Sequence, residues 1–97
     1  MQQLLLCVTY TAKLGMREKF MQELLSSGLL DEIRQEEGCL GYAYYFSVQD
    51  EDDILLVEQW DTEAHQKRHL EQPHMEKLRS IKNCYVVDTR VEKAFRG

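Results

Sequence analysis

The sequence predicts an α+β domain in which strands and helices follow one another in the order β-α-β-β-α-β. Four segments are rich in the β-branched, aromatic and aliphatic residues that favour strands. Between the first two, apolar residues recur at three- and four-residue spacings, which indicates a helix. Between the last two, a second helical segment is interrupted by the single proline of the chain.

The first strand is predicted over residues 4–11, where Leu4, Leu6, Val8 and Tyr10 would share one face. Residues 13–15 form a turn before a helix over residues 16–36. The apolar stripe of this helix slips out of phase at residues 26–28, so we expect a bend there. Gly38 would end the helix as its C-cap.

The second and third strands are predicted over residues 41–48 and 54–60, joined by the acidic turn QDEDD. In the third strand, Glu58 has the same parity as Ile54, Leu56 and Trp60, which places an acid among apolar residues. Thr62 is a typical N-cap for a short helix ending at Leu70. Pro73 would restart a second helix over residues 73–80, and residues 84–95 would form the last strand.

This order of elements is the ferredoxin-like arrangement, a four-stranded sheet with helices on one face. The other face would carry Leu5, Cys7, Tyr45 and Val57, which are too apolar to face water along a whole sheet. A second copy packed sheet to sheet would cover them. The sequence therefore predicts a homodimer.

Composition limits the classes of function. The 97 residues suffice for one domain, spanning residues 1–97, and the net charge of −5 argues against nucleic acid and anionic membranes as partners. The apolar run near the start is too short to span a bilayer and lacks the features of a signal peptide. Three cysteines, an odd number without a CxxC pair, indicate reduced, mostly buried thiols in a cytoplasmic protein.

Residues 57–78 contain all three histidines of the chain. His65 and His69 are four residues apart and would share a helix face, with His74 and Glu58 as further candidate metal ligands. The segment lacks the glutamate of an HExxH motif, and Lys67 and Arg68 lie between the two histidines. We therefore expect no metal site, and we interpret His65 as a residue of the helix surface.

His69 is the candidate acid–base residue, because a histidine turned towards the sheet would face Glu58 and Trp60. A purely structural histidine, bonded to a backbone carbonyl or to Glu58, is the alternative. Glu58 would be costly to bury alone, so it should lie at the rim or pair with His69, Arg79 or Arg90. Trp60 would be either a site residue or a large core residue. Tyr10, Tyr42 and Tyr44 would direct their hydroxyls into the same space.

The segments EEGCLGYAYYF, ILLVEQW and DTEAHQKRHLEQPHM resemble the antibiotic biosynthesis monooxygenase superfamily, and within it the quinol monooxygenase-like branch. The resemblance implies a dimeric α/β barrel with a pocket between sheet and helices. Some members oxidise quinols or polycyclic phenols with O₂ and no metal or flavin, so no cofactor is expected. The Asn, Trp and His of the haem-degrading members are replaced here by Val8, His69 and Arg79.

From this resemblance we expect a cofactor-free monooxygenase in which His69 or Glu58 deprotonates a quinol and Trp60 helps to hold its ring. Arg79 would steady the developing anion. The alternatives are an acid–base isomerase of a small carbonyl compound and a non-enzymatic, small-molecule-binding stress protein. The expected substrate-binding set comprises Tyr10, Tyr42, Tyr44, Leu56, His74 and Arg79.

Overall fold

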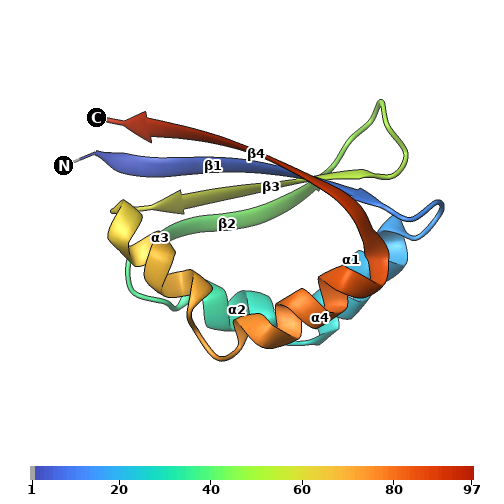
Figure 1. Cartoon of the computed structure of the whole chain (residues 1–97), viewed down its shortest axis with the longest axis horizontal. Helices are drawn as coiled ribbons and strands as arrows, with labels where there is room; N and C mark the ends of the chain where they lie inside the picture. The colour runs from blue at the N-terminus through green and yellow to red at the C-terminus, as the bar shows by residue number, and fades with distance from the viewer. Residues whose placement is uncertain (1) are drawn as a thin grey trace.

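The computed structural model describes residues 2–97 and shows a four-stranded antiparallel sheet with every helix on one face (Figure 1). The strands lie in the order β2-β3-β1-β4, which confirms the ferredoxin-like prediction. Among the described helices, none has the length and apolarity needed to cross a membrane. The elements are β1 Gln3–Ala12, α1 Arg17–Ser26, α2 Leu29–Arg34, β2 Cys39–Phe46, β3 Asp53–Trp60, α3 Glu63–Leu70, α4 Met75–Tyr85 and β4 Val86–Arg96.

The predicted bend in the first helical segment is a full break between α1 and α2. Gly28 has φ +80°, a left-handed conformation that glycine adopts without steric cost. The Ser27 hydroxyl accepts a hydrogen bond from the Leu29 N–H and donates one to the Leu24 carbonyl, so it bridges the two helices. The break lets both helices bury apolar residues against the sheet.

Several boundaries differ from the prediction; β2, for example, covers Cys39–Phe46 rather than residues 41–48. Helix α2 ends at Arg34 with Gln35 as its C-cap, so Gly38 belongs to the following turn. Helix α4 begins after His74 rather than at Pro73. It also runs on to Tyr85, because Leu78 and Ile81 extend its buried face by another turn, and β4 starts only at Val86. Cys84, predicted as a buried strand residue, is consequently an exposed helix residue.

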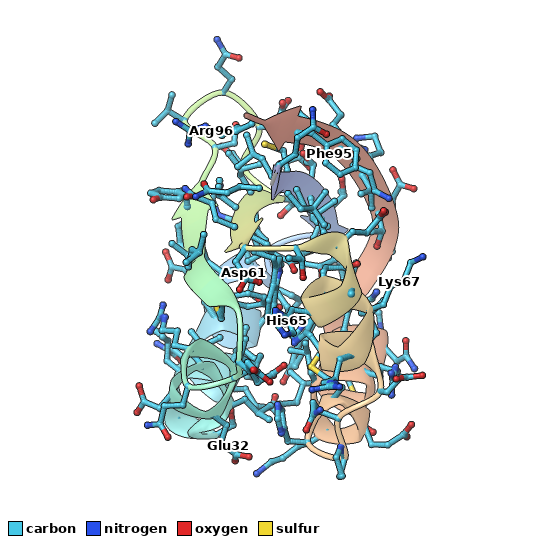
Figure 2. The ribbon with its side chains drawn as sticks, turned by 90° about the vertical axis from the view of Figure 1, so that its left-hand side faces the viewer. Glu32, Asp61, His65, Lys67, Phe95 and Arg96 are labelled. Carbon is cyan, nitrogen blue, oxygen red and sulfur yellow. The ribbon has the colours of Figure 1, made fainter. Side chains whose placement is uncertain are left out.

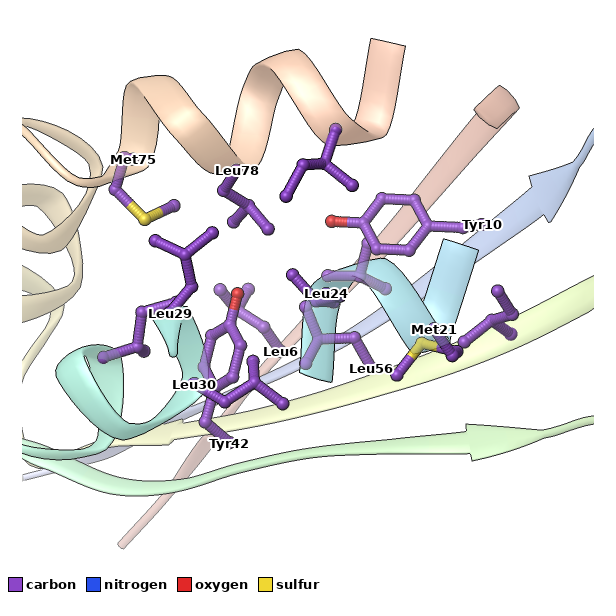
Figure 3. Packing of buried hydrophobic residues seen from close by; sticks show 14 of the residues in the cluster. Leu6, Tyr10, Met21, Leu24, Leu29, Leu30, Tyr42, Leu56, Met75 and Leu78 are labelled. Carbon is purple, nitrogen blue, oxygen red and sulfur yellow. The ribbon is translucent and has the colours of Figure 1, made fainter. Parts of the chain in front are cut away.

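The even-numbered residues of β1 and β3 form the sheet face that packs against the helices. In the register, Leu4 lies opposite Trp60 and Leu6 opposite Glu58, so the acid shares the buried face as its parity predicts. Figure 3 shows Met75 and Leu78 of α4 across the core from Leu29 and Leu30 of α2. This core positions the side chains discussed below.

The opposite sheet face carries no helix (Figure 1). Cys7 lies opposite Val57 at its centre, and both are only partly exposed. Towards the edge, Tyr45 is 54% exposed. The apolar face predicted from the sequence is therefore present, and no segment of residues 2–97 covers it.

The turn before β2 packs tightly on the start of α3. Gly38 has φ +86°, and a Cβ at this position would overlap Asp61 and His65. The Asp61 N–H donates to the Gly38 carbonyl at 2.9 Å. Glycine is thus required both for conformation and for close approach, and the contact brings Glu36 and Glu37 beside α3.

Candidate acid–base site

His69 lies in the last turn of α3 and is 1% exposed. The helix starts at Thr62, whose hydroxyl accepts the His65 N–H at 3.2 Å, as the sequence predicts for an N-cap. The centroid of the His69 ring lies 4.7 Å from that of Trp60 and 5.7 Å from that of Tyr42. The histidine therefore faces the sheet, against the aromatic residues expected beside it.

The acid that binds His69 is Glu36, not Glu58. His69 Nδ1 lies 3.0 Å from each carboxylate oxygen of Glu36. The same carboxylate is 2.7 Å from His74 Nε2, and its side chain is only 9% exposed. His74 Nδ1 in turn lies 3.4 Å from Glu32. A buried carboxylate between two histidines thus forms the centre of the site.

This arrangement determines which nitrogen of His69 is available. A carboxylate only accepts hydrogen bonds, so Nδ1 must carry a hydrogen and donate it to Glu36. In the neutral ring the lone pair then lies on Nε2. Within residues 2–97, no hydrogen bond engages that nitrogen. The pair therefore has the geometry of a carboxylate-oriented general base.

Glu58 is buried, at 6% exposure, and it accepts the indole N–H of Trp60 at 3.1 Å. The expected alternatives, a rim position or pairing with His69, Arg79 or Arg90, are wrong. Residues two apart on a strand point to the same side, so the indole is its nearest donor. Burial raises the pKa of Glu58, and the Trp60 hydrogen bond and the nearby His69 offset part of this rise.

Replacing Glu58 by glutamine should stabilise the protein at pH values above the pKa that the Glu58 carboxyl has in the folded state. Because that pKa is raised, the native state binds more protons than the unfolded state between the two pKa values, and stability falls as pH rises. Glutamine keeps an acceptor for Trp60 without the buried charge, so we expect a gain of about 1 kcal/mol at pH 7. Urea unfolding of both proteins measures the difference in the free energy of unfolding, from about pH 4, near the ordinary pKa of a glutamate, to about pH 8. A wild-type slope that persists in the variant would contradict it.

The three tyrosines lie on the helix-covered face of the sheet, opposite Ile54, Glu58 and Leu56. Figure 3 shows the hydroxyl ends of Tyr10 and Tyr42 pointing into the same interior space. Burial raises the pKa of Tyr10, Tyr42 and Tyr44, and the Glu58 carboxylate raises each of them further. Leu56 lies fully buried on the same sheet face. Among them only Tyr42 is in ring contact with His69, whereas Tyr10 packs on Phe20 and Tyr44 lies farther along β2, opposite Leu56.

Arg79 does not reach this cluster. Its guanidinium donates to the Leu70 carbonyl at 2.6 Å and to Glu76 at 2.8 Å, so it holds the α3–α4 junction. His74, expected in the substrate-binding set, lies in the turn just before α4 and binds Glu36 and Glu32 from there. The structure thus adds Glu36 to the site and leaves Arg79 outside it.

His65 is more constrained than a surface residue. Its Nδ1 lies 2.6 Å from Asp61 and its Nε2 lies 3.7 Å from Glu37. Figure 2 shows Asp61 and His65 together at the start of α3, whereas Lys67 points away. A cavity of about 240 Å³ opens next to them, lined by Glu36, Glu37, His65, Arg68, His69 and Gln72. His69 therefore borders a polar cavity as well as the core.

The histidines do not assemble a metal centre. Across residues 2–97, no three His, Cys, Asp or Glu side chains are arranged to hold a metal ion. Each histidine is instead matched with carboxylates: His65 with Asp61, His69 and His74 with Glu36. The arrangement suits proton transfer.

Comparison with solved structures shows the same fold in several bacteria and an archaeon. The crystal structure of PA3566 from Pseudomonas aeruginosa matches all of this chain and 96% of its own, with a TM-score of 0.85 and 26% identity. SO0527 from Shewanella oneidensis matches with a TM-score of 0.85 at 22% identity over 98% of this chain and 91% of its own. A conserved protein from Methanosarcina mazei Go1 matches with a TM-score of 0.86 at 19% identity, over 100% of this chain and 95% of its own.

Comparison of sequences identifies relatives. "Probable quinol monooxygenase YgiN" of Escherichia coli K12 is 36% identical over 55 residues, which are 48% of this chain and 53% of that protein. The match thus spans about half the length of this relative, and the protein of the same name in Shigella flexneri matches equally. The family model described as antibiotic biosynthesis monooxygenase matches residues 4–80. The chain therefore belongs to the antibiotic biosynthesis monooxygenase family.

Proposed function

We propose that this protein oxidises a quinol or related phenol with O₂ and without a cofactor, and that His69 is the general base. The observation that carries the proposal is the buried Glu36–His69 pair, in which the carboxylate holds Nδ1 and Nε2 has no hydrogen-bond partner within residues 2–97; the ring packs against Trp60 and Tyr42. Family membership supports oxygen chemistry, and the similarity to a probable quinol monooxygenase supports the substrate class.

In this mechanism His69 Nε2 takes the proton of the phenolic hydroxyl. A phenol has a pKa of about 10 in water, so a positioned base is needed near neutral pH. The Glu36 carboxylate stabilises the imidazolium that forms, because it already accepts the Nδ1 hydrogen. The electron-rich phenolate then donates an electron to O₂. Overall a quinol loses four electrons: one oxygen atom enters the ring, giving a hydroxyquinone, and the other leaves as water.

A second candidate is an acid–base isomerase of a small carbonyl compound. The observation that favours it is the lining of the cavity beside His69, which is polar and includes Glu37, Arg68 and Gln72. Such a cavity suits a small hydroxylated molecule at least as well as an aromatic ring. The same His69–Glu36 pair would move a proton between neighbouring carbons, and no oxygen would be consumed.

We also propose that the protein acts as a cytoplasmic homodimer. The helix-free sheet face, with Cys7 and Val57 at its centre, supports sheet-to-sheet packing of two copies. The three free cysteines of the protein are consistent with a reducing compartment such as the cytoplasm. Sedimentation equilibrium should give twice the mass of the 11.5 kDa chain, and a monomer mass would refute the dimer.

An oxygen electrode tests the oxidation directly, with menadiol as substrate and heat-denatured protein as the control for autoxidation. Wild-type protein should accelerate O₂ uptake, and with ¹⁸O₂ one labelled atom should appear in the product. Replacing His69 by glutamine should lower the rate by about 10²- to 10⁴-fold, as expected for loss of a general base. His65→Gln should lose far less, because its ring is not bound by Glu36. Hydrogen peroxide without labelled product, or full activity of His69→Gln, would contradict the mechanism.

A further inference from the structure

A second cavity lies on the other side of α2, away from His69. Its volume is about 410 Å³, and residues of α1, α2 and β2 form its walls. Met21 and Leu30 are buried and project from the two helices towards the sheet (Figure 3), while Leu25 and Phe46 are more exposed. No residue of the Glu36 cluster lines it. Its size falls within the range of small-molecule sites.

One cation stands at this apolar cavity. Arg34, the last residue of α2, donates from Nε to the Tyr42 carbonyl at 3.0 Å, which fixes the guanidinium at the edge of β2. Its two terminal nitrogens make no ion pair with an acid of residues 2–97, although the chain has 17 acidic and 12 basic residues. Arg68, Arg79 and Arg90, by contrast, each pair with a carboxylate.

The walls of the cavity are held in place before any ligand arrives. The guanidinium of Arg17 lies 4.1 Å from the centre of the Phe46 ring. Arg17 itself donates to the backbone carbonyls of Ser47, Asp50 and Asp53, at 2.9 to 3.2 Å. Because Phe46 is fixed in this way, a ligand would lose little free energy in ordering the site.

Tyr44 adds an aromatic ring to the wall of this cavity. Its ring lines the cavity and packs against Tyr42, with ring centroids 5.8 Å apart. Its hydroxyl is buried and has no hydrogen-bond partner among the described residues. The hydroxyl is directed into the core, where burial raises its pKa and Tyr10 and the Glu58 carboxylate add to this effect, so the ring of Tyr44 and not its hydroxyl is available to a ligand.

We propose that this cavity binds an aromatic monocarboxylate of one or two rings, with its carboxylate on Arg34. The planar guanidinium presents parallel N–H groups that match a carboxylate. The ring would lie against Met21, Leu30 and Phe46, which bury its apolar surface. This site goes beyond the proposed function, because binding there requires neither O₂ nor His69.

The test compares 2-naphthoate with its neutral isostere 2-naphthamide by calorimetric titration of the intact protein. Wild type should bind the acid about tenfold or more tightly than the amide, because a hydrogen bond between two charged groups contributes more to the affinity than one to a neutral amide. Arg34→Gln should remove this preference and leave amide binding unchanged. Arg90→Gln, which removes the same charge from a surface ion pair, should keep the preference.

Amide chemical shifts then locate the ligand. On addition of 2-naphthoate, the residues around Met21, Leu30 and Phe46 should shift, and those around His69 should not. Leu30→Gln, which makes the wall polar, should weaken both ligands equally, and circular dichroism verifies that each variant is folded. Equal affinity for acid and amide in wild type, a preference that survives in Arg34→Gln, or shifts centred on His69 would each overturn the proposal. Because no step involves oxidation, these results are independent of the quinol assay.

Discussion

Glu36→Ala should lower the free energy of unfolding by about 3 kcal/mol, because it leaves the imidazole N–H groups of two histidines without their acceptor. The carboxylate is the shared partner of His69 and His74, and all three side chains are largely buried. Urea unfolding at pH 7, followed by the fluorescence of the single tryptophan, measures the loss. Trp60 is itself packed against His69, so its emission reports on this part of the core.

The neighbouring residue provides the control. Glu37 is also a glutamate of the same turn, but its side chain is 69% exposed and it contacts Arg68 and His65 at 3.3 and 3.7 Å. Exposed pairs of this kind contribute about 0–1 kcal/mol, so Glu37→Ala should be nearly neutral. Similar losses in the two variants would show that the buried carboxylate does not hold the site together.

A milder change separates stability from chemistry. Glu36→Gln keeps one oxygen that can accept from His69, so it should unfold less readily than Glu36→Ala. It removes the negative charge that stabilises the imidazolium, so the turnover number for quinol should fall while KM changes little. A rise in KM with an unchanged turnover number would assign Glu36 to substrate binding instead.

The sequence was most informative where one element determines the outcome. Alternation along β3 predicted that Glu58 and Trp60 share the buried face, and the Ser-Ser-Gly run predicted the break before α2. Each of these depends on neighbours a few residues away.

The partners of the charged residues could not be predicted in this way. Glu36 and His69 are 33 residues apart, and they meet because Gly38 allows its turn to pack on α3. Before that contact is known, Glu36 is one of two adjacent acids in EEGC, and nothing local distinguishes it from the exposed Glu37. The prediction for Arg79 was wrong for the same reason, because the packing of the α3–α4 junction determines its partners. The prediction that Cys84 lies in a strand was wrong because the packing of α4 outweighed the strand propensity of its neighbours.

Trp60→Ala should be the most destabilising single change in the chain, with a loss of about 4 kcal/mol. The side chain is fully buried opposite Leu4, so its removal leaves a cavity in the core, and Glu58 loses its hydrogen-bond donor. Trp60→Phe separates the two effects: it retains most of the apolar volume but not the indole N–H, so it should cost about 1–3 kcal/mol. Far-UV circular dichroism in urea measures both, because the variants lack the fluorophore.

A double-mutant cycle isolates the Trp60–Glu58 hydrogen bond. If the indole stabilises the protein partly by satisfying the buried carboxylate, Glu58→Leu should make Trp60→Phe less costly than it is in wild type. Strict additivity would mean that packing alone explains the tryptophan. A coupling free energy would instead show that Glu58 and Trp60 stabilise the protein as a pair. The Glu58 carboxylate would then serve to fix the orientation of Trp60, the ring against which His69 packs.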